Sequence, residues 1–124
     1  MAIKVLIVED DVTLNEMYSM KFLLDWFEVV SAYDGMEWLS KIKEFRPDVV
    51  LLDIMMPWIN WIDTIELIKK EADYNLKIIM FTNLNDKGNM EKAMAKWADD
   101  FVLKADTTPK QAVEKVLKLL DKTA

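Results

Sequence analysis

Acidic side chains follow two apolar runs of this sequence, and they are the residues best suited to chemistry. Glu9, Asp10 and Asp11 follow the first run, and Asp53 follows another, Val49–Leu52. Carboxylates held close together repel one another unless a cation joins them. An all-oxygen set without histidine or cysteine suits Mg²⁺ or Mn²⁺. These positions therefore predict a site for a hard divalent cation.

A hydroxyl and an amine follow two later apolar runs. Thr82 ends the run over residues 77–81, and Lys104 ends the run over residues 101–103. A lysine and a hydroxyl opposite a cation can receive a phosphoryl group, and Asp53 can attack phosphorus and become an acyl phosphate. Taken singly, each residue has an ordinary explanation, such as a helix cap, an Asx turn or a solvated lysine. Their joint position at strand ends favours the chemical interpretation.

The apolar runs also predict the strands that position these residues. Val49–Leu52 is too short for a helix and too uniformly apolar for a half-exposed strand, so it indicates a strand buried on both faces. Strands are expected over residues 4–8, 28–32, 49–52, 77–81 and 101–103. The second of these is the least apolar and is expected at an edge of the sheet.

Between the predicted strands, apolar residues recur at helical spacing. Helices are expected over about 12–25, over about 36–45, around Ile62, Ile65 and Ile68, over about 89–96, and at the C-terminal end. The first is an amphipathic pattern of Leu14, Met17 and Leu24 with flanking Met20, Leu23 and Phe27. In the helix expected over about 36–45, Leu39 and Ile42 face inward. In the last, Thr107 or Thr108 can cap the helix, Pro109 fits its first turn, and Val113, Val116, Leu117 and Leu120 recur at helical spacing.

The alternation of strands and helices predicts an α/β fold. We expect a five-stranded parallel sheet of order 2-1-3-4-5, doubly wound as in a flavodoxin-like (βα)5 fold. In that order the first and third strands flank the switch point, where ligands bind beyond the carboxyl ends of the strands. Those are the two strands that end in acidic residues. No glycine-rich phosphate loop follows the first strand, which disfavours a dinucleotide-binding fold.

Composition narrows the function further. The 124 residues include no cysteine and no histidine, which excludes disulfides, thiolate chemistry and imidazole catalysis. A net charge of -6 argues against direct nucleic-acid binding and suits a protein partner or a hard cation. No apolar run approaches the ~20 residues of a membrane span, and the first residues lack the basic-then-apolar pattern of a signal peptide, so neither a membrane span nor a signal peptide is expected. A single cytoplasmic domain over residues 1–124 is therefore expected.

These motifs together resemble the receiver domain of two-component response regulators, over about residues 3 to 122. The matching segments are LIVEDD, LLDIMMP, MFTN and DDFVLKA. The resemblance implies that Asp53 is the phosphoacceptor and that Thr82 and Lys104 hold the phosphoryl group. It also implies a switch in which Phe101 turns inward when Thr82 moves. The implied Mg²⁺ site comprises Glu9, Asp10, Asp53 and the backbone carbonyl of Met55.

The resemblance implies signalling rather than enzymatic turnover of a substrate. The expected phosphodonor is a histidine kinase or phosphotransfer protein, and the expected output is a shape change read by a downstream protein effector. A homodimer is left open. One alternative is a degenerate receiver that binds proteins independently of phosphorylation. Another is a Mg²⁺-dependent phosphatase with an aspartyl nucleophile, but no second general-acid aspartate and no cap are visible in the sequence.

The loop after Lys104 departs from the family pattern. Receiver domains usually have Lys-Pro with a cis bond at this point, whereas Lys104 is followed by Ala105. A cis bond to a residue other than proline costs ~3 kcal/mol. We therefore expect a trans bond and a rearranged loop.

The tryptophans are a second departure. Trp26, Trp58, Trp61 and Trp97 stand where family members typically have glycine, and Trp38 stands where they have alanine or another small residue. The chain has only 2 glycines, whereas ~7% of its length would give roughly nine. We hypothesise that a codon read as glycine in the source organism, such as UGA, was read here as tryptophan. Deliberate engineering and natural drift are the alternatives, and the codons at the five positions distinguish them.

Overall fold

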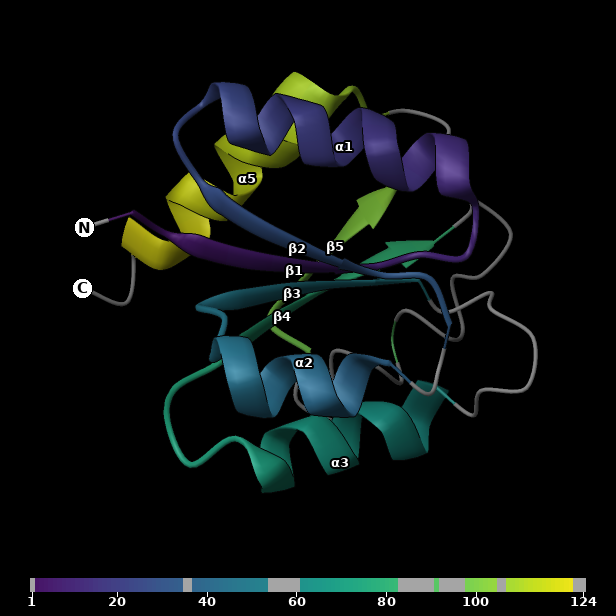
Figure 1. The fold of residues 1–124 in the computed structure, drawn as a ribbon, viewed down its shortest axis with the longest axis vertical. Helices are drawn as coiled ribbons and strands as arrows, with labels where there is room; N and C mark the ends of the chain where they lie inside the picture. The colour runs from purple at the N-terminus through teal and green to yellow at the C-terminus, as the bar shows by residue number, and fades with distance from the viewer. Residues whose placement is uncertain are drawn as a thin grey trace.

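A five-stranded parallel sheet occupies the middle of the molecule, with helices on both of its faces (Figure 1). The computed structural model describes residues 2–34, 37–53, 61–82, 91, 98–104 and 107–121, without the side chains of Trp61, Ile62 and Thr82. Apart from Glu91, the expected helix over residues 89–96 lies outside this description, as do Met55, Trp58, Trp97 and the Lys104–Ala105 bond.

The strands and their order confirm the expected topology. They are β1 (Lys4–Val8), β2 (Glu28–Ala32), β3 (Val49–Asp53), β4 (Lys77–Thr82) and β5 (Asp100–Leu103). Their order is β2-β1-β3-β4-β5, and all four pairings are parallel. The least apolar strand, β2, lies at an edge as expected, and β3 lies at the centre with all five residues buried.

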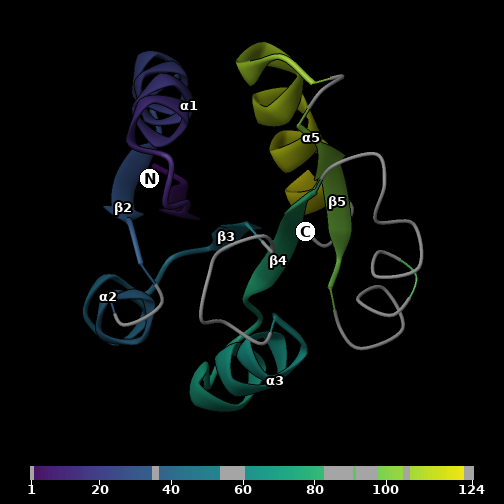
Figure 2. The ribbon, with the colours of Figure 1, turned by 90° about the vertical axis from the view of Figure 1, so that its right-hand side faces the viewer.

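The helices divide between the two faces of the sheet. They are α1 (Val12–Leu24), α2 (Trp38–Phe45), α3 (Trp61–Glu71) and α5 (Pro109–Asp121). Helices α1 and α5 lie together on one face, and α2 and α3 lie on the other (Figures 1 and 2). This is the doubly wound arrangement, in which right-handed crossovers that run in opposite directions along the sheet place their helices on opposite faces.

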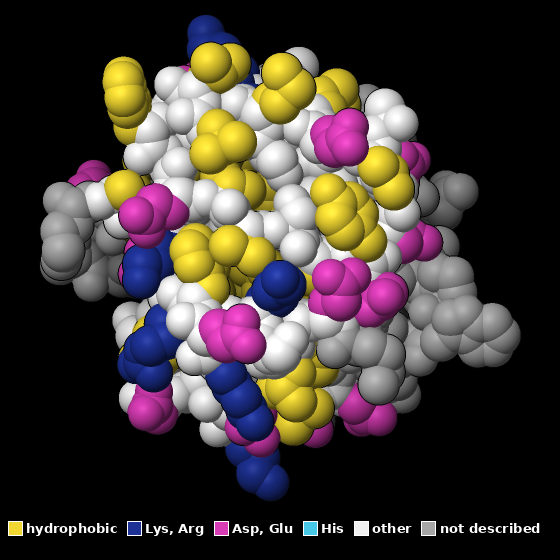
Figure 3. All heavy atoms as spheres, viewed as in Figure 1, with side chains coloured by type: hydrophobic (Ala, Val, Ile, Leu, Met, Phe, Trp, Pro, Cys, Tyr) yellow, Lys and Arg dark blue, Asp and Glu magenta, His cyan; other side chains and the backbone are white. Residues whose placement is uncertain are grey.

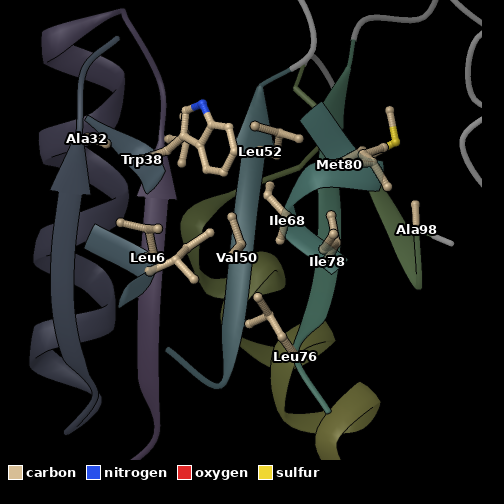
Figure 4. Close-up of a cluster of buried hydrophobic side chains, with 13 residues drawn as sticks. Leu6, Ala32, Trp38, Val50, Leu52, Ile68, Leu76, Ile78, Met80 and Ala98 are labelled. Atoms are coloured by element: carbon tan, nitrogen blue, oxygen red, sulfur yellow. The ribbon is translucent and has the colours of Figure 1, made fainter. Parts of the chain in front are cut away.

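Each face of the sheet has its own hydrophobic core, because alternate residues of a strand point to opposite faces. On the α2/α3 side, Leu6, Val50 and Ile78 pack with side chains of those helices (Figure 4). On the α1/α5 side, Ile7 and Leu51 pack with Tyr18 and Phe22 of α1 and with Val113 and Val116 of α5. The two cores fix which strand ends lie side by side.

Helix α1 has the expected bounds but not the expected inward face. Its buried residues are Asn15, Tyr18 and Phe22. The apolar residues at 12, 17, 20, 23 and 24 are exposed, and hydrophobic side chains gather over this part of the molecule (Figure 3). Apolar residues occur all round α1, so their periodicity could not show which side faces the sheet. The expectation that Met17 and Leu24 mark the packed face was therefore wrong.

Helix α5 begins with a reciprocal cap. The Thr108 Oγ1 accepts a hydrogen bond from the Gln111 N–H at 3.2 Å, and the Thr108 N–H donates to Gln111 Oε1 at 2.9 Å. These two bonds form a capping box. Thr108 is therefore the cap of the two candidates. Val113 and Val116 point inward as expected, whereas Leu117 is exposed.

Trp26 occupies a backbone position that favours glycine. After α1, the Phe27 N–H bonds to Phe22 O and the Trp26 N–H bonds to Leu23 O, which together form a Schellman motif. Trp26 has a φ of 71°, in the left-handed region. A residue with a Cβ is disfavoured there, and the Trp26 side chain is 87% exposed. The side chain therefore has little burial to offset the backbone strain.

We expect Trp26→Gly to raise the free energy of unfolding, because glycine relieves the strain of the left-handed backbone. Trp26→Ala is the matched control, since it removes the indole but keeps the Cβ. Urea denaturation should show the glycine variant more stable than the alanine variant by about 1 kcal/mol. Equal stabilities of the two variants would show that the left-handed conformation is not a source of strain.

Candidate functional site

Three of the predicted site residues meet beyond the carboxyl ends of the strands. Asp53 is the last residue of β3, Glu9 follows β1 and Lys104 follows β5. Strands β1 and β3 are direct neighbours, with Val8 opposite Leu52, so the next residues along each strand are Glu9 and Asp53. Both carboxyl groups are buried, with exposures of 1% and 2%.

Lys104 bridges the two buried carboxylates. Its Nζ lies 2.8 Å from Glu9 Oε1 and 3.1 Å from Asp53 Oδ1. The lysine comes from the far side of β4, which lies between β3 and β5, and the four-carbon stem of a lysine suits this reach. The expectation of a solvated surface lysine is excluded, because only 17% of the side chain is exposed.

Glu9, Asp10 and Asp53 also form a compact oxygen cluster. One carboxylate oxygen from each lies within 4.8 Å of the others. Glu9 and Asp53 are buried, whereas Asp10 is exposed on the solvent side. Among the described residues, Glu9 Oε2 is a buried oxygen with no hydrogen-bond partner. An orphaned oxygen beside two further carboxylates fits a hard cation such as Mg²⁺, which takes a few carboxylate ligands and completes its shell with water.

The electrostatics reflect this crowding. Burial, followed by the hydrogen bond to Asp53, raises the pKa of Glu9 from 4.5 to about 8, against the opposing effect of Lys104. For Lys104, burial acts to lower the pKa, but the hydrogen bond to Glu9 and the attraction of Asp53 outweigh it and raise the pKa. The buried carboxyl of Glu9 therefore holds its proton more tightly than an exposed glutamate does, beside a charged lysine.

Asp11 has a structural role instead. Its side chain accepts a hydrogen bond from the Leu14 N–H at 3.0 Å and caps the N-terminus of α1. Of the three consecutive acidic residues, Asp11 thus caps α1, and Glu9 and Asp10 belong to the oxygen cluster. The explanation as a helix N-terminal acidic group holds for Asp11, and not for the buried Glu9.

Of the predicted site residues, Thr82 is described only in part and Met55 is not described. Thr82 is the last residue of β4 and pairs with Leu103, but its side chain is outside the described atoms. Met55 lies outside the described residues altogether. Phe101 is half-buried against the α2/α3 core, and Lys115 Nζ lies 5.1 Å from the centre of its ring.

Sequence reasoning missed Asn15, a fully buried polar residue beside the cluster. It donates to the backbone carbonyl of Glu9 at 3.0 Å. The sequence did offer a signal: Asn15 stands four residues after the Asp11 cap, on a helix whose other inward residues are aromatic. Because the inward face of α1 was misassigned, that signal could not be recognised.

No helix in the described parts of the chain combines the length and apolar character needed to cross a lipid bilayer.

Comparisons with known proteins agree with this fold and show the family of the chain. A family model, described as the response regulator receiver domain, matches residues 5–117. The DNA-binding response regulator MtrA of Mycobacterium tuberculosis (strain ATCC 25618 / H37Rv) is 34% identical over 113 residues, covering 91% of this chain and 48% of that protein. This chain spans about half the length of the curated relatives it matches.

Solved structures show the same similarity. A CheY-like receiver domain protein from Methanospirillum hungatei JF-1 matches with a TM-score of 0.89 and 25% identity, covering 98% of this chain and 96% of that chain. The response regulator DrrB from Thermotoga maritima matches with a TM-score of 0.84 and 27% identity, covering 99% of this chain and 54% of that chain.

The raised pKa of Glu9 predicts a pH-dependent stability in the absence of divalent cations. The folded state binds the Glu9 proton more tightly than the unfolded state, so this contribution is complete below about pH 4.5 and is lost as the pH rises through about 8. Glu9→Gln stays neutral and should remove this part of the decline. Urea denaturation in EDTA from pH 5 to 9 measures it, with the exposed Glu16→Gln as the control. A decline as steep in Glu9→Gln as in the wild type would contradict the assignment.

Proposed function

The chain belongs to the response regulator receiver domain family, and from this premise we propose that it signals by accepting a phosphoryl group on Asp53. The observation that carries the proposal is the contact of Lys104 with both Glu9 and Asp53 beside the exposed Asp10. A receiver domain is a signalling module, so the chain catalyses only its own phosphorylation and dephosphorylation. The result is a covalent mark rather than a released product.

The chemistry follows from the positions of these side chains. A carboxylate oxygen of Asp53 attacks phosphorus, a new P–O bond forms, and the bond from phosphorus to the donor breaks with its electron pair leaving on the donor. Lys104 Nζ, 3.1 Å from Asp53 Oδ1, can then donate to a phosphoryl oxygen. The cation we propose is Mg²⁺, held by Glu9, Asp10, Asp53 and the Met55 carbonyl; when bound it neutralises charge on the phosphoryl oxygens.

Switching would follow from the same residues. In our proposal the Thr82 hydroxyl holds the phosphoryl group together with Lys104, and Phe101 changes position when Thr82 moves. Support comes from the placement of Thr82 at the end of β4, next to β5, which carries Phe101. Phe101 is half-buried, so its ring has room to become more buried or more exposed.

The proposed partners follow from the family and from the charge. Receiver domains pair with histidine kinases, so we propose a kinase or phosphotransfer protein as phosphodonor, in the cytoplasm where receiver domains typically act. The net charge of -6 favours a protein effector over direct contact with nucleic acid. MtrA is described as DNA-binding, but this chain covers only about half of it, so that property is not transferred.

Acetyl phosphate with Mg²⁺ provides the direct test of the phosphoacceptor. Intact mass should show one phosphoryl group on the wild type and none on Asp53→Ala, because the attacking oxygen is absent. The matched control is Asp73→Ala, an exposed carboxylate in a surface ion pair with Arg46, which should be phosphorylated like the wild type. Phosphorylation of Asp53→Ala at the wild-type level would refute Asp53. An unmodified wild type would favour a receiver that binds partners without phosphorylation.

Cation binding has its own test. Asp10→Ala should weaken Mg²⁺ binding at least about tenfold, or about 1.4 kcal/mol, because one carboxylate of the cluster is lost. The control is Asp11→Asn, which removes a neighbouring charge while keeping a good helix cap. Isothermal titration calorimetry should show the control within about twofold of the wild type, since exposed charges are screened by salt. Equal losses in both variants would point to a general charge effect instead of a ligand.

A further inference from the structure

Asn15 holds together three parts of the chain around the acidic cluster. Its Nδ2 lies 3.0 Å from Glu9 O, 3.3 Å from Ala32 O and 3.4 Å from Ile7 O, so it faces the carboxyl ends of β1 and β2. Its Oδ1 accepts hydrogen bonds from Ser31 Oγ at 2.7 Å and Ser19 Oγ at 3.1 Å. The side chain is fully buried.

The network requires an amide at this position. Carbonyl oxygens alone surround Nδ2, and hydroxyl groups alone surround Oδ1, so the orientation of the amide is fixed. An aspartate has no N–H to donate to the three carbonyl oxygens. An apolar side chain would offer neither a donor to those oxygens nor an acceptor to the two serine hydroxyls. Among the described residues, Asn15 is the side chain that donates to the carbonyl of Glu9.

The Glu9 carbonyl belongs to the peptide that joins two members of the oxygen cluster. A peptide unit is planar, so its orientation fixes the relation between the Cα atoms of Glu9 and Asp10. The preceding peptide, Val8–Glu9, is held as well, since its N–H donates to Ala32 O at 3.0 Å. Asn15 contacts that same Ala32 oxygen. The amide therefore fixes the backbone from which both carboxylates project.

We propose that Asn15 is a positioning residue of the acidic site, which acts by holding the Glu9–Asp10 peptide in the orientation that aims both carboxylates at Asp53. This inference rests on the proposed function, because it supposes that the cluster binds a cation. Misplacing ligands by a fraction of an ångström weakens a metal site, which is why sites are held by a supporting shell of hydrogen bonds. Its hydrogen bonds go to backbone carbonyls and serine hydroxyls, so Asn15 would act on the site through the backbone.

A purely structural role would give a different result, and the serines supply the matched controls. Ser19→Ala and Ser31→Ala each remove a partner of Oδ1 but leave the bond from Nδ2 to the Glu9 carbonyl intact. They lie in the same network, so they should also lower the stability of α1 against β2. They should not free the Glu9–Asp10 peptide.

The experiment compares Asn15→Ala with these two serine variants. If Asn15→Ala does not fold, Asn15→Ser takes its place. Hydrogen exchange at the Glu9 amide, measured by NMR without Mg²⁺ and without phosphodonor, should be at least about tenfold faster than in the serine variants, after correction for global stability at amides of β3. Calorimetry should show Mg²⁺ affinity reduced about tenfold in the Asn15 variant. The serine variants should bind Mg²⁺ like the wild type.

Two results would overturn the inference. One is Glu9 exchange in the Asn15 variant no faster than in the serine variants, which would show that Asn15 does not hold the backbone at Glu9. The other is unchanged Mg²⁺ affinity despite faster exchange, which would show that the peptide orientation does not matter to the site. A wild type that binds no Mg²⁺ would refute the proposed function and the positioning role together. In that case, faster exchange in the Asn15 variant would show only that the side-chain amide of Asn15 stabilises the local backbone.

Discussion

The repulsion between two buried carboxylates is the constraint on which the site depends. Glu9 and Asp53 are held side by side by the pairing of β1 with β3, and both are almost completely removed from water. Removing charged groups from water costs several kcal/mol per ion unless a partner compensates. Lys104 supplies one positive charge to both, yet the pKa of Glu9 is still raised, first by burial and then by the hydrogen bond to Asp53. The cluster is thus prepared to take additional positive charge.

Much of this arrangement could be predicted from the sequence because it depends on strands. A strand buried on both faces is recognisable by its uniform apolar character, and the residue after it lies at the ligand-binding edge of a parallel sheet. Asp53, Glu9 and Lys104 were identified in this way, and the structure brings all three together. The sheet order followed from the same alternation of elements and is confirmed.

The facing of α1 could not be predicted, and Asn15 was missed with it. Met17, Met20 and Leu24 are apolar and exposed, whereas the buried face carries an amide and the hydroxyl of Tyr18. Burying an amide is favourable only when each of its hydrogen-bonding groups finds a partner, and most of those partners lie outside α1, on β2 and at the end of β1. Periodicity measures hydropathy along one helix. It contains no information about partners on other elements.

Two tryptophans show opposite relations to the fold, and this bears on the recoding hypothesis. Trp38 is 5% exposed and lies in the α2/α3 core beside Ala32 and Leu52 (Figure 4), where loss of a large aromatic side chain costs ~3–5 kcal/mol. Trp26 is exposed and sits in a left-handed backbone that glycine adopts without strain. The fold therefore uses the side chain of Trp38 and gains nothing visible from that of Trp26. If both tryptophans came from one recoded codon, α2 would have to pack closer to the sheet when residue 38 is small. At residue 26 no rearrangement would be needed, because the Schellman hydrogen bonds are already those of a glycine cap.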